Sequence, residues 1–300
     1  MNIRRPIILG IVKNYGIQDL SPFIYSLKKT GYTGDLCLFV DGLSPETLEF
    51  LDQHGVILQS LPTRYFTQSR RHLIRLVANL APAKFRQAAQ IELSRYYLHL
   101  IDVRWPCYFD FLKKTRGIYS HVMFTDIKDV LFQRSPFEFD WKSPFCSFLE
   151  FPGSFIKDES HTRGWLETGF GREEAQKLHD REVICAGVSF AEIEAALEYL
   201  DLMCNHLVRI NARGLVDQGI HNYLLHHRLL KASSIYGYSD SPVLHLGLMP
   251  LEKLELNEEG LVVNGSGQVV HAIHQYFSHR KTLGRCLDLV TAPTGSVPAK

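Results

Sequence analysis

The sequence carries almost no net charge. It has 33 lysines and arginines against 32 aspartates and glutamates, so the formal net charge is +1. This balance gives no electrostatic footprint for nucleic acid or for an anionic membrane surface, and we expect neither as a partner. It does not bear on small anionic substrates, which need only a local basic patch.

Long apolar runs are also missing. The basic start of the chain, residues 1–6, is followed by a run of only six residues, 7–12, before Lys13. Such a run is too short for a signal-peptide core or a membrane span. We therefore expect no transmembrane segment, and a cytoplasmic protein or one that reaches a membrane face through a partner.

Closely spaced cysteines are absent. The two nearest in sequence, Cys185 and Cys204, are nineteen positions apart, so the chain has no C-x-x-C zinc or redox motif. Most cysteines lie in apolar stretches, where this residue acts as a small hydrophobe. We expect reduced thiols. The six are Cys37, Cys107, Cys146, Cys185, Cys204 and Cys286.

Three common catalytic loops are missing as well. The chain contains no G-x-x-x-x-G-K-[ST] loop, no G-x-G-x-x-G turn and no G-x-S-x-G elbow. These absences argue against a P-loop nucleotidase, a classical dinucleotide-binding enzyme and an α/β-hydrolase.

Strand and helix patterns alternate over the first sixty residues. Apolar runs at 7–12, 36–40 and 56–58 predict buried strands, and helical periodicity at 18–30 and 45–51 predicts the crossovers, with Ser44 as an N-cap. This order predicts a parallel sheet with right-handed connections.

The pattern continues to the C-terminal region. Residues 66–101 are predicted to be helical with a break at Pro82, and the polar segment 153–182 is predicted to be an insertion or loop bordering a site. We expect one α/β domain over residues 1–290 and a disordered tail over 291–300. Further strands are predicted at 121–124, 145–151, 183–190, 243–246, 261–263 and 268–273, and further helices at 191–207 and 217–230.

The most informative stretch is 122–132, in which an apolar strand delivers Asp126 and Asp129. Carboxylates at the end of a buried strand are costly unless they hold a cation or a polar partner. Mg²⁺ or Mn²⁺ suits them because these ions prefer oxygen ligands. Strand positions three apart face opposite ways, so both carboxylates reach one ion only if the chain turns, which Lys128 favours. Alternatively, Asp129 caps the next segment or pairs with Arg134.

Residues 124–137, with the pattern D-x-x-D-V-x-F-Q, resemble the metal-binding region of GT-A glycosyltransferases and of a branch of bacterial and plant nucleotide-sugar transferases. Three later segments match in the same order: I-C-A-G-V at 184–188, D-Q-G-I-x-N at 217–222 and V-H-A-I-H-Q-Y at 270–276. Cys185 stands where that family usually has asparagine, and Phe277 where it has aspartate.

The resemblance covers residues 5–282 and implies a mostly parallel central sheet with flanking helices. It implies transfer of a sugar from a nucleotide-diphosphate sugar to an unknown glycan, lipid or protein acceptor, with Mn²⁺ or Mg²⁺ held by Asp126, Asp129 and His274. Asp126 and Asp217 would be the catalytic residues, with Asp217 orienting sugar hydroxyls or acting as a base. The implied donor-binding residues are Tyr15, Asp41, Arg95, Ala186, Gly187 and Gln218.

Each of these residues has a structural alternative. Asp217 would serve equally well as a helix N-cap, Arg95 as a solvated or ion-paired residue, and Tyr15 as surface packing. His271, three positions from His274 in a predicted strand, faces the other way and is expected to be structural or on the surface.

Two further functions stay open at this point. One is a catalytically degenerate protein of the same fold that binds nucleotide or glycan. The other is a nucleotidyltransferase, which would need a glycine-rich basic loop after the first strand, and residues 13–16 supply little of one.

Overall fold

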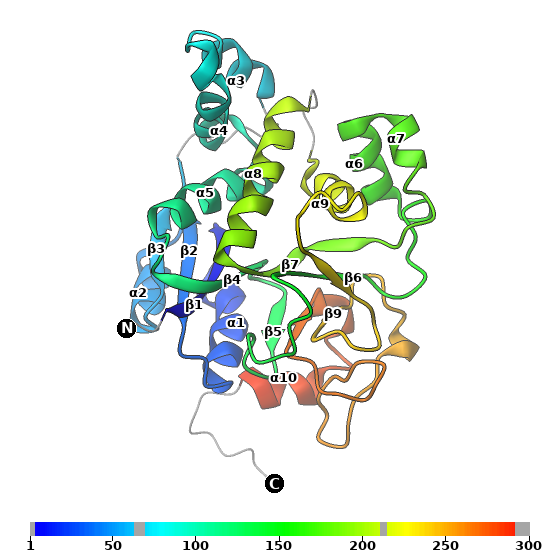
Figure 1. Cartoon of the computed structure of the whole chain (residues 1–300). Coiled ribbons are helices and arrows are strands. Elements are labelled where there is room, and N and C mark those ends of the chain that lie inside the picture. Colours follow the sequence, from blue (N-terminus) through cyan, green and yellow to red (C-terminus); the bar gives the residue numbers. More distant parts are fainter. Residues whose placement is uncertain (1–3, 63–69, 211–214, 292–300) are drawn as a thin grey trace.

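A seven-stranded sheet forms the centre of the computed structural model, which describes residues 4–62, 70–210 and 215–291 (Figure 1). The strand order is β3-β2-β1-β4-β7-β6-β8, and β7 alone runs against the other described strands. The predicted α/β class with a mostly parallel sheet is therefore confirmed. The strands are β1 (Arg5–Lys13), β2 (Asp35–Asp41), β3 (Ile57–Ser60), β4 (Tyr119–Thr125), β6 (Phe145–Leu149), β7 (Ile184–Glu192) and β8 (Ser234–Tyr236).

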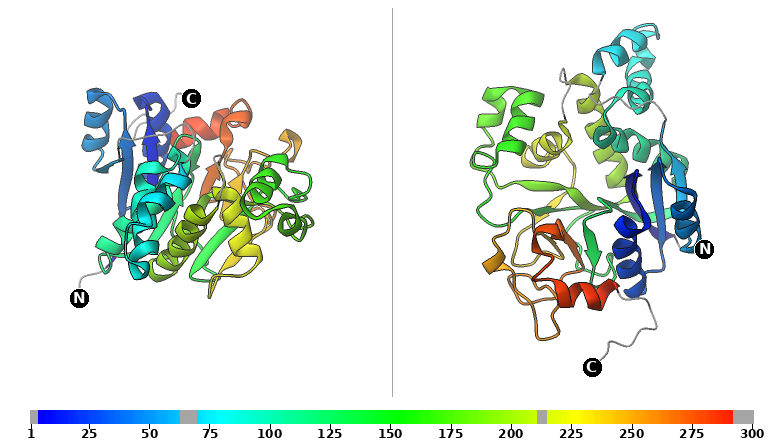
Figure 2. Two further views of the ribbon diagram at one scale, coloured as in Figure 1. Left: turned by 90° about the horizontal axis from the view of Figure 1, so that it is seen from above. Right: turned by 180° about the vertical axis from the view of Figure 1, so that it is seen from behind.

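Helices cover both faces of this sheet (Figure 2). In β1, Ile7 and Leu9 pack into the core beneath α5 and α8, whereas Ile8 and Val12 pack against α1 on the other face. A parallel sheet buried on both faces needs apolar residues at consecutive positions, which explains the continuous apolar run. The helices are α1 (Ile17–Lys29), α2 (Pro45–Gln53), α3 (Arg71–Ala78), α4 (Arg86–Tyr97), α5 (Leu100–Lys114), α6 (Ser160–Phe170), α7 (Arg172–Gln176), α8 (Ile193–Arg209), α9 (Asp217–His226) and α10 (Gly284–Thr291), with short 3-10 turns at Ala83–Phe85, Leu251–Lys253 and Tyr276–His279.

Local sequence rules account for several helix ends. The Oγ of Ser44 accepts a hydrogen bond from the Thr47 backbone N–H at 3.2 Å, so the predicted N-cap of α2 is confirmed. The predicted helix over 217–230 ends earlier, at His226, because Arg228 adopts a left-handed conformation with φ of 53°.

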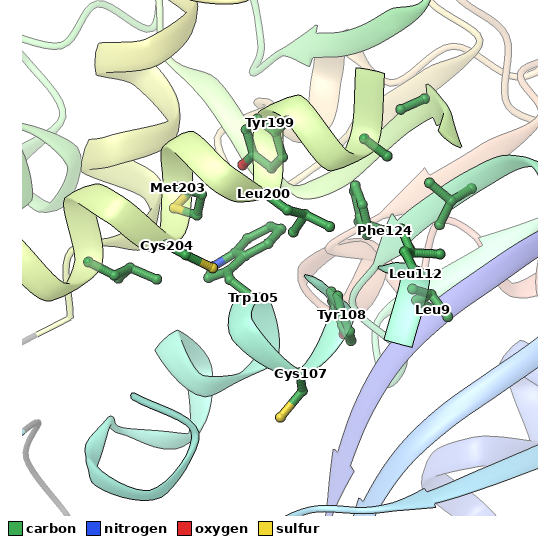
Figure 3. Packing of buried hydrophobic residues seen from close by; sticks show 14 of the residues in the cluster. Leu9, Trp105, Cys107, Tyr108, Leu112, Phe124, Tyr199, Leu200, Met203 and Cys204 are labelled. Atoms are coloured by element: carbon green, nitrogen blue, oxygen red, sulfur yellow. The ribbon is translucent and has the colours of Figure 1, made fainter. Parts of the chain in front are cut away.

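The helical region predicted to end at residue 101 extends further, because α5 occupies Leu100–Lys114. Residues 66–69 of that prediction lie outside the described residues. Side chains all around α5 are buried, among them Trp105, Cys107 and Tyr108, and the helix contains Pro106. A helix without a polar face shows no amphipathic period, so the pattern missed it. In Figure 3, Trp105 and Tyr108 lie between α8 and Phe124 of β4.

A second, three-stranded sheet lies beside the first. It is formed by β5 (Val130–Phe132), β10 (Ala272–His274) and β9 (Val243–His245), with β10 in the middle. The strands predicted at 243–246 and 268–273 belong here, whereas 261–263 forms only isolated bridges. Helix α10 packs beside α1 and the apolar residues of this sheet (Figure 1).

The structure adds detail to two predicted segments, the polar segment 153–182 and the C-terminal tail. The polar segment 153–182, predicted to be an insertion or loop bordering a site, contains the helices α6 and α7. Thr291, predicted to begin the tail, is the last residue of α10, and residues 292–300 lie outside the described part. None of the helices within the described residues is both long and apolar enough to cross a membrane.

Candidate functional site

A cleft of about 570 Å³ lies where β1 and β4 end. From β1 the chain adds β2 and β3 on one side, whereas β4 pairs on the other side. Ligands of open α/β sheets bind at such a switch point, outside the carboxyl ends of the strands. Eight of the ten residues predicted for the site line this cleft: Tyr15, Asp126, Asp129, Ala186, Gly187, Asp217, Gln218 and His274.

Asp126 and Asp129 face the same point because the chain turns at 127–129, between β4 and β5. The Asp126 N–H donates to the Gly187 carbonyl at 2.8 Å and holds the start of this turn beside β7. The Nε2 of His274 is 3.5 Å from Asp126 Oδ2 and 3.7 Å from Asp129 Oδ2. The three side chains thus offer two oxygens and one nitrogen within 4.8 Å of one another.

Two features of this cluster fit a divalent cation. The Nε2 of His274 is buried and has no hydrogen-bond partner among the described residues, although it points at both carboxylates. A Cβ added to Gly187 would lie 2.2 Å from His274 Cε1 and 3.0 Å from Asp126 Oδ2, so only glycine leaves room there. An oxygen-rich set with one imidazole suits Mn²⁺ or Mg²⁺.

The second sheet delivers His274 to the carboxylates. In the register of β10, His274 lies opposite Val130 of β5, which is the residue that follows Asp129 in the sequence. The next residue, Gln275, adopts a left-handed conformation, and its N–H donates to the Asp129 carbonyl at 2.9 Å. His271 points elsewhere, with its Nδ1 2.6 Å from the Ser135 carbonyl, as its position in the sequence predicts.

The charges of the cluster are strongly coupled. Burial raises the pKa of Asp126, but Arg104 and His274 outweigh burial and hold the pKa at about 2. Burial, helped by the neighbouring Asp126, outweighs His274 and raises the pKa of Asp129. Burial lowers the pKa of His274, but the two carboxylates outweigh it and raise the pKa above the ordinary value. The carboxylates therefore attract positive charge to the point between them and His274.

Arg104 links the two ends of the cleft, and the sequence analysis missed it. Its Nη1 donates to Asp126 Oδ1 at 2.6 Å and its Nη2 donates to Asp217 Oδ2 at 2.7 Å. The side chain is only 8% exposed, and a buried guanidinium is tolerated only when it is paired. An arginine inside the apolar stretch 100–108 is the feature that could have indicated this role.

Asp217 is the first residue of α9 rather than its N-cap, which is Val216. Its Oδ2 accepts from Arg104 and, at 3.4 Å, from the indole N–H of Trp105, while its Oδ1 accepts from the Gln218 N–H at 2.9 Å. The carboxylate is held rigidly at the floor of the cleft.

The start of α9 is fastened to the start of β7. Gln218 accepts a hydrogen bond from the Ala186 N–H at 3.4 Å and donates to Thr162 Oγ1 at 2.9 Å. One turn later, Asn222 accepts from the Ile184 N–H and donates to the Ile184 carbonyl. Because β7 is antiparallel, its first residues lie beside the last residues of β4, which places 185–187 in the cleft.

Two predicted donor-binding residues do not line the cleft. Arg95 pairs with Glu92 at 2.9 Å and Asp110 at 3.2 Å, as its structural alternative predicts, and nothing in the cleft geometry supports its predicted donor-binding role. The helix that leads into β4 is α5, one helix later than the one that carries Arg95. Asp41 ends β2 and pairs with Lys13 at 3.2 Å; Lys13 lines the cleft, and a donor-binding role for Asp41 stays a prediction.

No protein-family model matches the chain, and no curated protein matches it. Several solved glycosyltransferase structures are similar to it. Galactosyltransferase LgtC, in complex with donor and acceptor sugar analogues, is 13% identical with a TM-score of 0.49, covering 97% of each chain. Core-mannan synthase A from Aspergillus fumigatus, in its Mn/GDP form, is 14% identical with a TM-score of 0.42, covering 75% of this chain and 70% of that one.

A third similar structure is glucosyl-3-phosphoglycerate synthase from Mycobacterium tuberculosis, in complex with Mn²⁺, uridine diphosphate and glucosyl-3-phosphoglycerate. It is 13% identical with a TM-score of 0.39, and the alignment covers 78% of this chain and 70% of that one. Values this low assign no activity to the chain, so the function is argued from its own residues.

Proposed function

We propose that this chain is a metal-dependent glycosyltransferase, which moves a sugar from a nucleotide-diphosphate sugar to a glycan, lipid or protein acceptor. The observation that carries the proposal is the convergence of Asp126, Asp129 and His274 at the switch point of the sheet. The order and spacing of the four sequence motifs support the same function. The expected cytoplasmic location stays a prediction.

Asp126, Asp129 and His274 would hold Mn²⁺ or Mg²⁺, which supplies Lewis-acid neutralisation of the charge on the departing nucleotide diphosphate. Arg104 prepares Asp126 for this task in two ways. It occupies Oδ1, which leaves Oδ2 directed at His274, and it keeps the carboxylate ionised.

Asp217 would accept hydrogen bonds from sugar hydroxyls. Its two oxygens already accept from Arg104, Trp105 and Gln218, so the carboxylate cannot rotate. A carboxylate fixed by three donors is suited to hold sugar hydroxyls in one orientation. Of the two roles expected from the sequence, orientation of the sugar is the one that these contacts support.

Residues after β1 would bind the nucleotide part of the donor. Tyr15 lines the cleft and presents a ring on which a base can stack, and the Nζ of Lys128 lies 5.4 Å from the centre of that ring. Lys13 and Lys128 are two cationic side chains of the cleft lining that suit phosphate groups. Ala186 and Gly187 would face the sugar, where the missing side chain of Gly187 permits close approach.

A catalytically degenerate binding protein is the second candidate. The observation that favours it is the pair of departures at Cys185 and Phe277, both of which line the cleft. Phe277 places an apolar ring, 37% exposed, where the resembling family has a carboxylate.

The first test is a thermal-shift screen of nucleotide diphosphates and nucleotide sugars, with and without Mn²⁺. A ligand at a hundredfold over its Kd stabilises the native state by about 2.7 kcal/mol, so one nucleotide should raise Tm when Mn²⁺ is present. Asp129→Asn should lose that shift, whereas Asp52→Asn, on the exposed side of α2, should keep it. A shift independent of both Mn²⁺ and Asp129 would contradict the proposed site.

Activity separates the two candidates. A transferase should hydrolyse the stabilising nucleotide sugar slowly in the presence of Mn²⁺, and Asp129→Asn should abolish this hydrolysis. A Mn²⁺-dependent shift without any release of the free sugar would favour the binding protein.

A further inference from the structure

A second group of metal-ligating side chains lies behind His274, on the side away from the two aspartates. The Nδ1 of His274 is 2.8 Å from the Nδ1 of His245 and 3.6 Å from the Sγ of Cys185. The three residues come from β10, β9 and β7 and are each at most 2% exposed. Their ligand atoms lie within 4.8 Å of one another.

A buried carboxyl group beside this cluster has an unsatisfied polar atom. The Oε2 of Glu150 has no hydrogen-bond partner among the described residues. Glu150 follows β6 and is 5% exposed, and burial raises the pKa of its carboxyl group and the pKa of the Cys185 thiol. Buried polar atoms are nearly always paired, so an unpaired carboxyl oxygen beside this cluster needs a physical explanation.

We propose that Cys185, His245 and His274 form an inner site for a borderline-soft divalent cation such as Zn²⁺, distinct from the outer site at Asp126 and Asp129. One sulfur and two imidazole nitrogens are ligands that Zn²⁺ prefers, whereas the outer, oxygen-rich set suits harder ions. The Cys185 thiolate and the Glu150 carboxylate together balance the two positive charges of the ion, which a buried site requires.

The distances between the ligand atoms fit this ion with a small adjustment. Zinc bonds of about 2.3 Å to sulfur and about 2.0 Å to nitrogen place tetrahedral ligands about 3.5 Å apart. The distance of 3.6 Å between Cys185 Sγ and His274 Nδ1 already matches this value. The two nitrogens at 2.8 Å share a proton and would separate by about half an ångström when the ion replaces it.

Proton positions link the two sites through His274. With both rings neutral, one proton lies between the two Nδ1 atoms. An inner cation takes the lone pairs of both Nδ1 atoms, so that proton moves to Nε2 of its own ring, and the Cys185 thiol proton leaves to solvent. His274 then carries Nε2–H, which donates to the carboxylates and cannot bind the outer ion. As a neutral imidazole, His274 therefore cannot bind both ions, and an inner cation would leave the outer ion with Asp126 and Asp129 alone.

Cobalt provides the direct test, because Co²⁺ replaces Zn²⁺ and its bond to a thiolate gives a charge-transfer absorption band in the near ultraviolet. We expect this band when Co²⁺ is added to the wild-type protein, and we expect Cys185→Ser to lose it. Cys146→Ser is the matched control, since Cys146 is also buried and its Sγ donates to the Ser143 carbonyl, which a hydroxyl can replace. Circular dichroism verifies that each variant is folded.

Asp129→Asn separates this inference from the proposed function, because it removes an outer ligand and leaves the inner set intact. The cobalt band should persist in that variant even though its Mn²⁺-dependent thermal shift is lost. His245→Gln should weaken the band and serves as the second variant if Cys185→Ser does not fold. Absence of the band from the wild-type protein, or its survival in Cys185→Ser, would overturn the inner site.

Discussion

Gly187 owes its place in the cleft to its missing side chain. A Cβ there would collide with the His274 ring at 2.2 Å and lie 3.0 Å from Asp126 Oδ2. Both neighbours are fixed, His274 by the β10 register and Asp126 by Arg104, so neither can move aside freely. The backbone φ of Gly187 is not positive, so alanine is excluded by space and not by conformation.

Gly187→Ala should therefore weaken Mn²⁺ binding by about tenfold or more, the range seen when the neighbours of metal ligands are disturbed. The measurement is a titration that follows free Mn²⁺ by electron paramagnetic resonance. Gly237→Ala is the matched control, because a Cβ at Gly237 would meet no atom within 4 Å. Equal Mn²⁺ affinity in the two variants would contradict an ion beside Gly187.

Sequence alone identified the residues of the cleft that belong to local motifs. Asp126, Asp129 and Asp217 were named because each lies at the end of a strand or the start of a helix with a distinctive neighbour. Arg104 and His245 were missed because their partners are far away in sequence: Arg104 meets Asp217 across 113 positions, and His245 meets His274 across 29. Such pairings depend on the three-dimensional arrangement of elements that no local pattern contains.

At the scale of elements, α9 and β7 act as one unit. The Asn222 side chain is fully buried and bonds both the N–H and the carbonyl of Ile184, at 2.9 and 2.8 Å. It also donates to the Gln218 carbonyl at 2.9 Å. These bonds satisfy the backbone at the start of β7, where the strand enters the cleft.

Asn222→Leu keeps the volume but leaves the N–H and carbonyl of Ile184 unpaired in the interior. Each unpaired buried group costs about 1–3 kcal/mol, so we expect the free energy of unfolding to fall by roughly 2–5 kcal/mol. Urea denaturation measures this change. A loss below about 0.5 kcal/mol, the usual range for surface substitutions, would show that water replaces the amide and that the two elements are not coupled in this way.

The sequence predicts a helix or strand where one face of the element is buried, or where the element is a short run of apolar residues. β1, β2 and α1 follow directly from such patterns, and each was found close to its predicted bounds. α5 was missed because it is buried on all sides. Strands were predicted at 243–246 and 268–273, but their assembly into a second sheet was missed. The three strands of that sheet have only three residues each, and the pairing of residues 130–132 with 272–274 depends on contacts distant in sequence.

For the whole molecule, the buried His221 and the half-buried His226 of α9 set a sensitivity to acid. Burial, followed by the charge of Arg104, lowers the pKa of His221 to about 3. Burial also lowers the pKa of His226 to about 4, although a hydrogen bond to the Glu182 carbonyl opposes it. In the unfolded chain both rings take up protons below pH about 6.5. In the folded protein His226 stays neutral down to pH about 4 and His221 down to pH about 3.

The unfolded state therefore binds more protons than the folded state in this window, and the free energy of unfolding falls as the pH is lowered from about 6.5 toward 4. Each histidine contributes a slope of about 1.4 kcal/mol per pH unit. His221→Phe should remove one such contribution, which urea denaturation at several pH values measures. An unchanged slope in that variant would mean that His221 is not held neutral by burial.

Among the described residues, three carboxylates and one guanidinium lie at the floor of the cleft: Asp126 and Asp217 share Arg104, and Asp129 faces the His274 imidazole. A divalent cation is attracted to these carboxylates, whereas they repel the diphosphate group of a donor until a cation lies between, even though Lys13 and Lys128 line the same cleft. If the chain has the proposed function, we expect ordered association, in which the cation enters first and the donor follows it. Release should run in the reverse order, with the spent diphosphate leaving before the ion, so that one ion serves many turnovers.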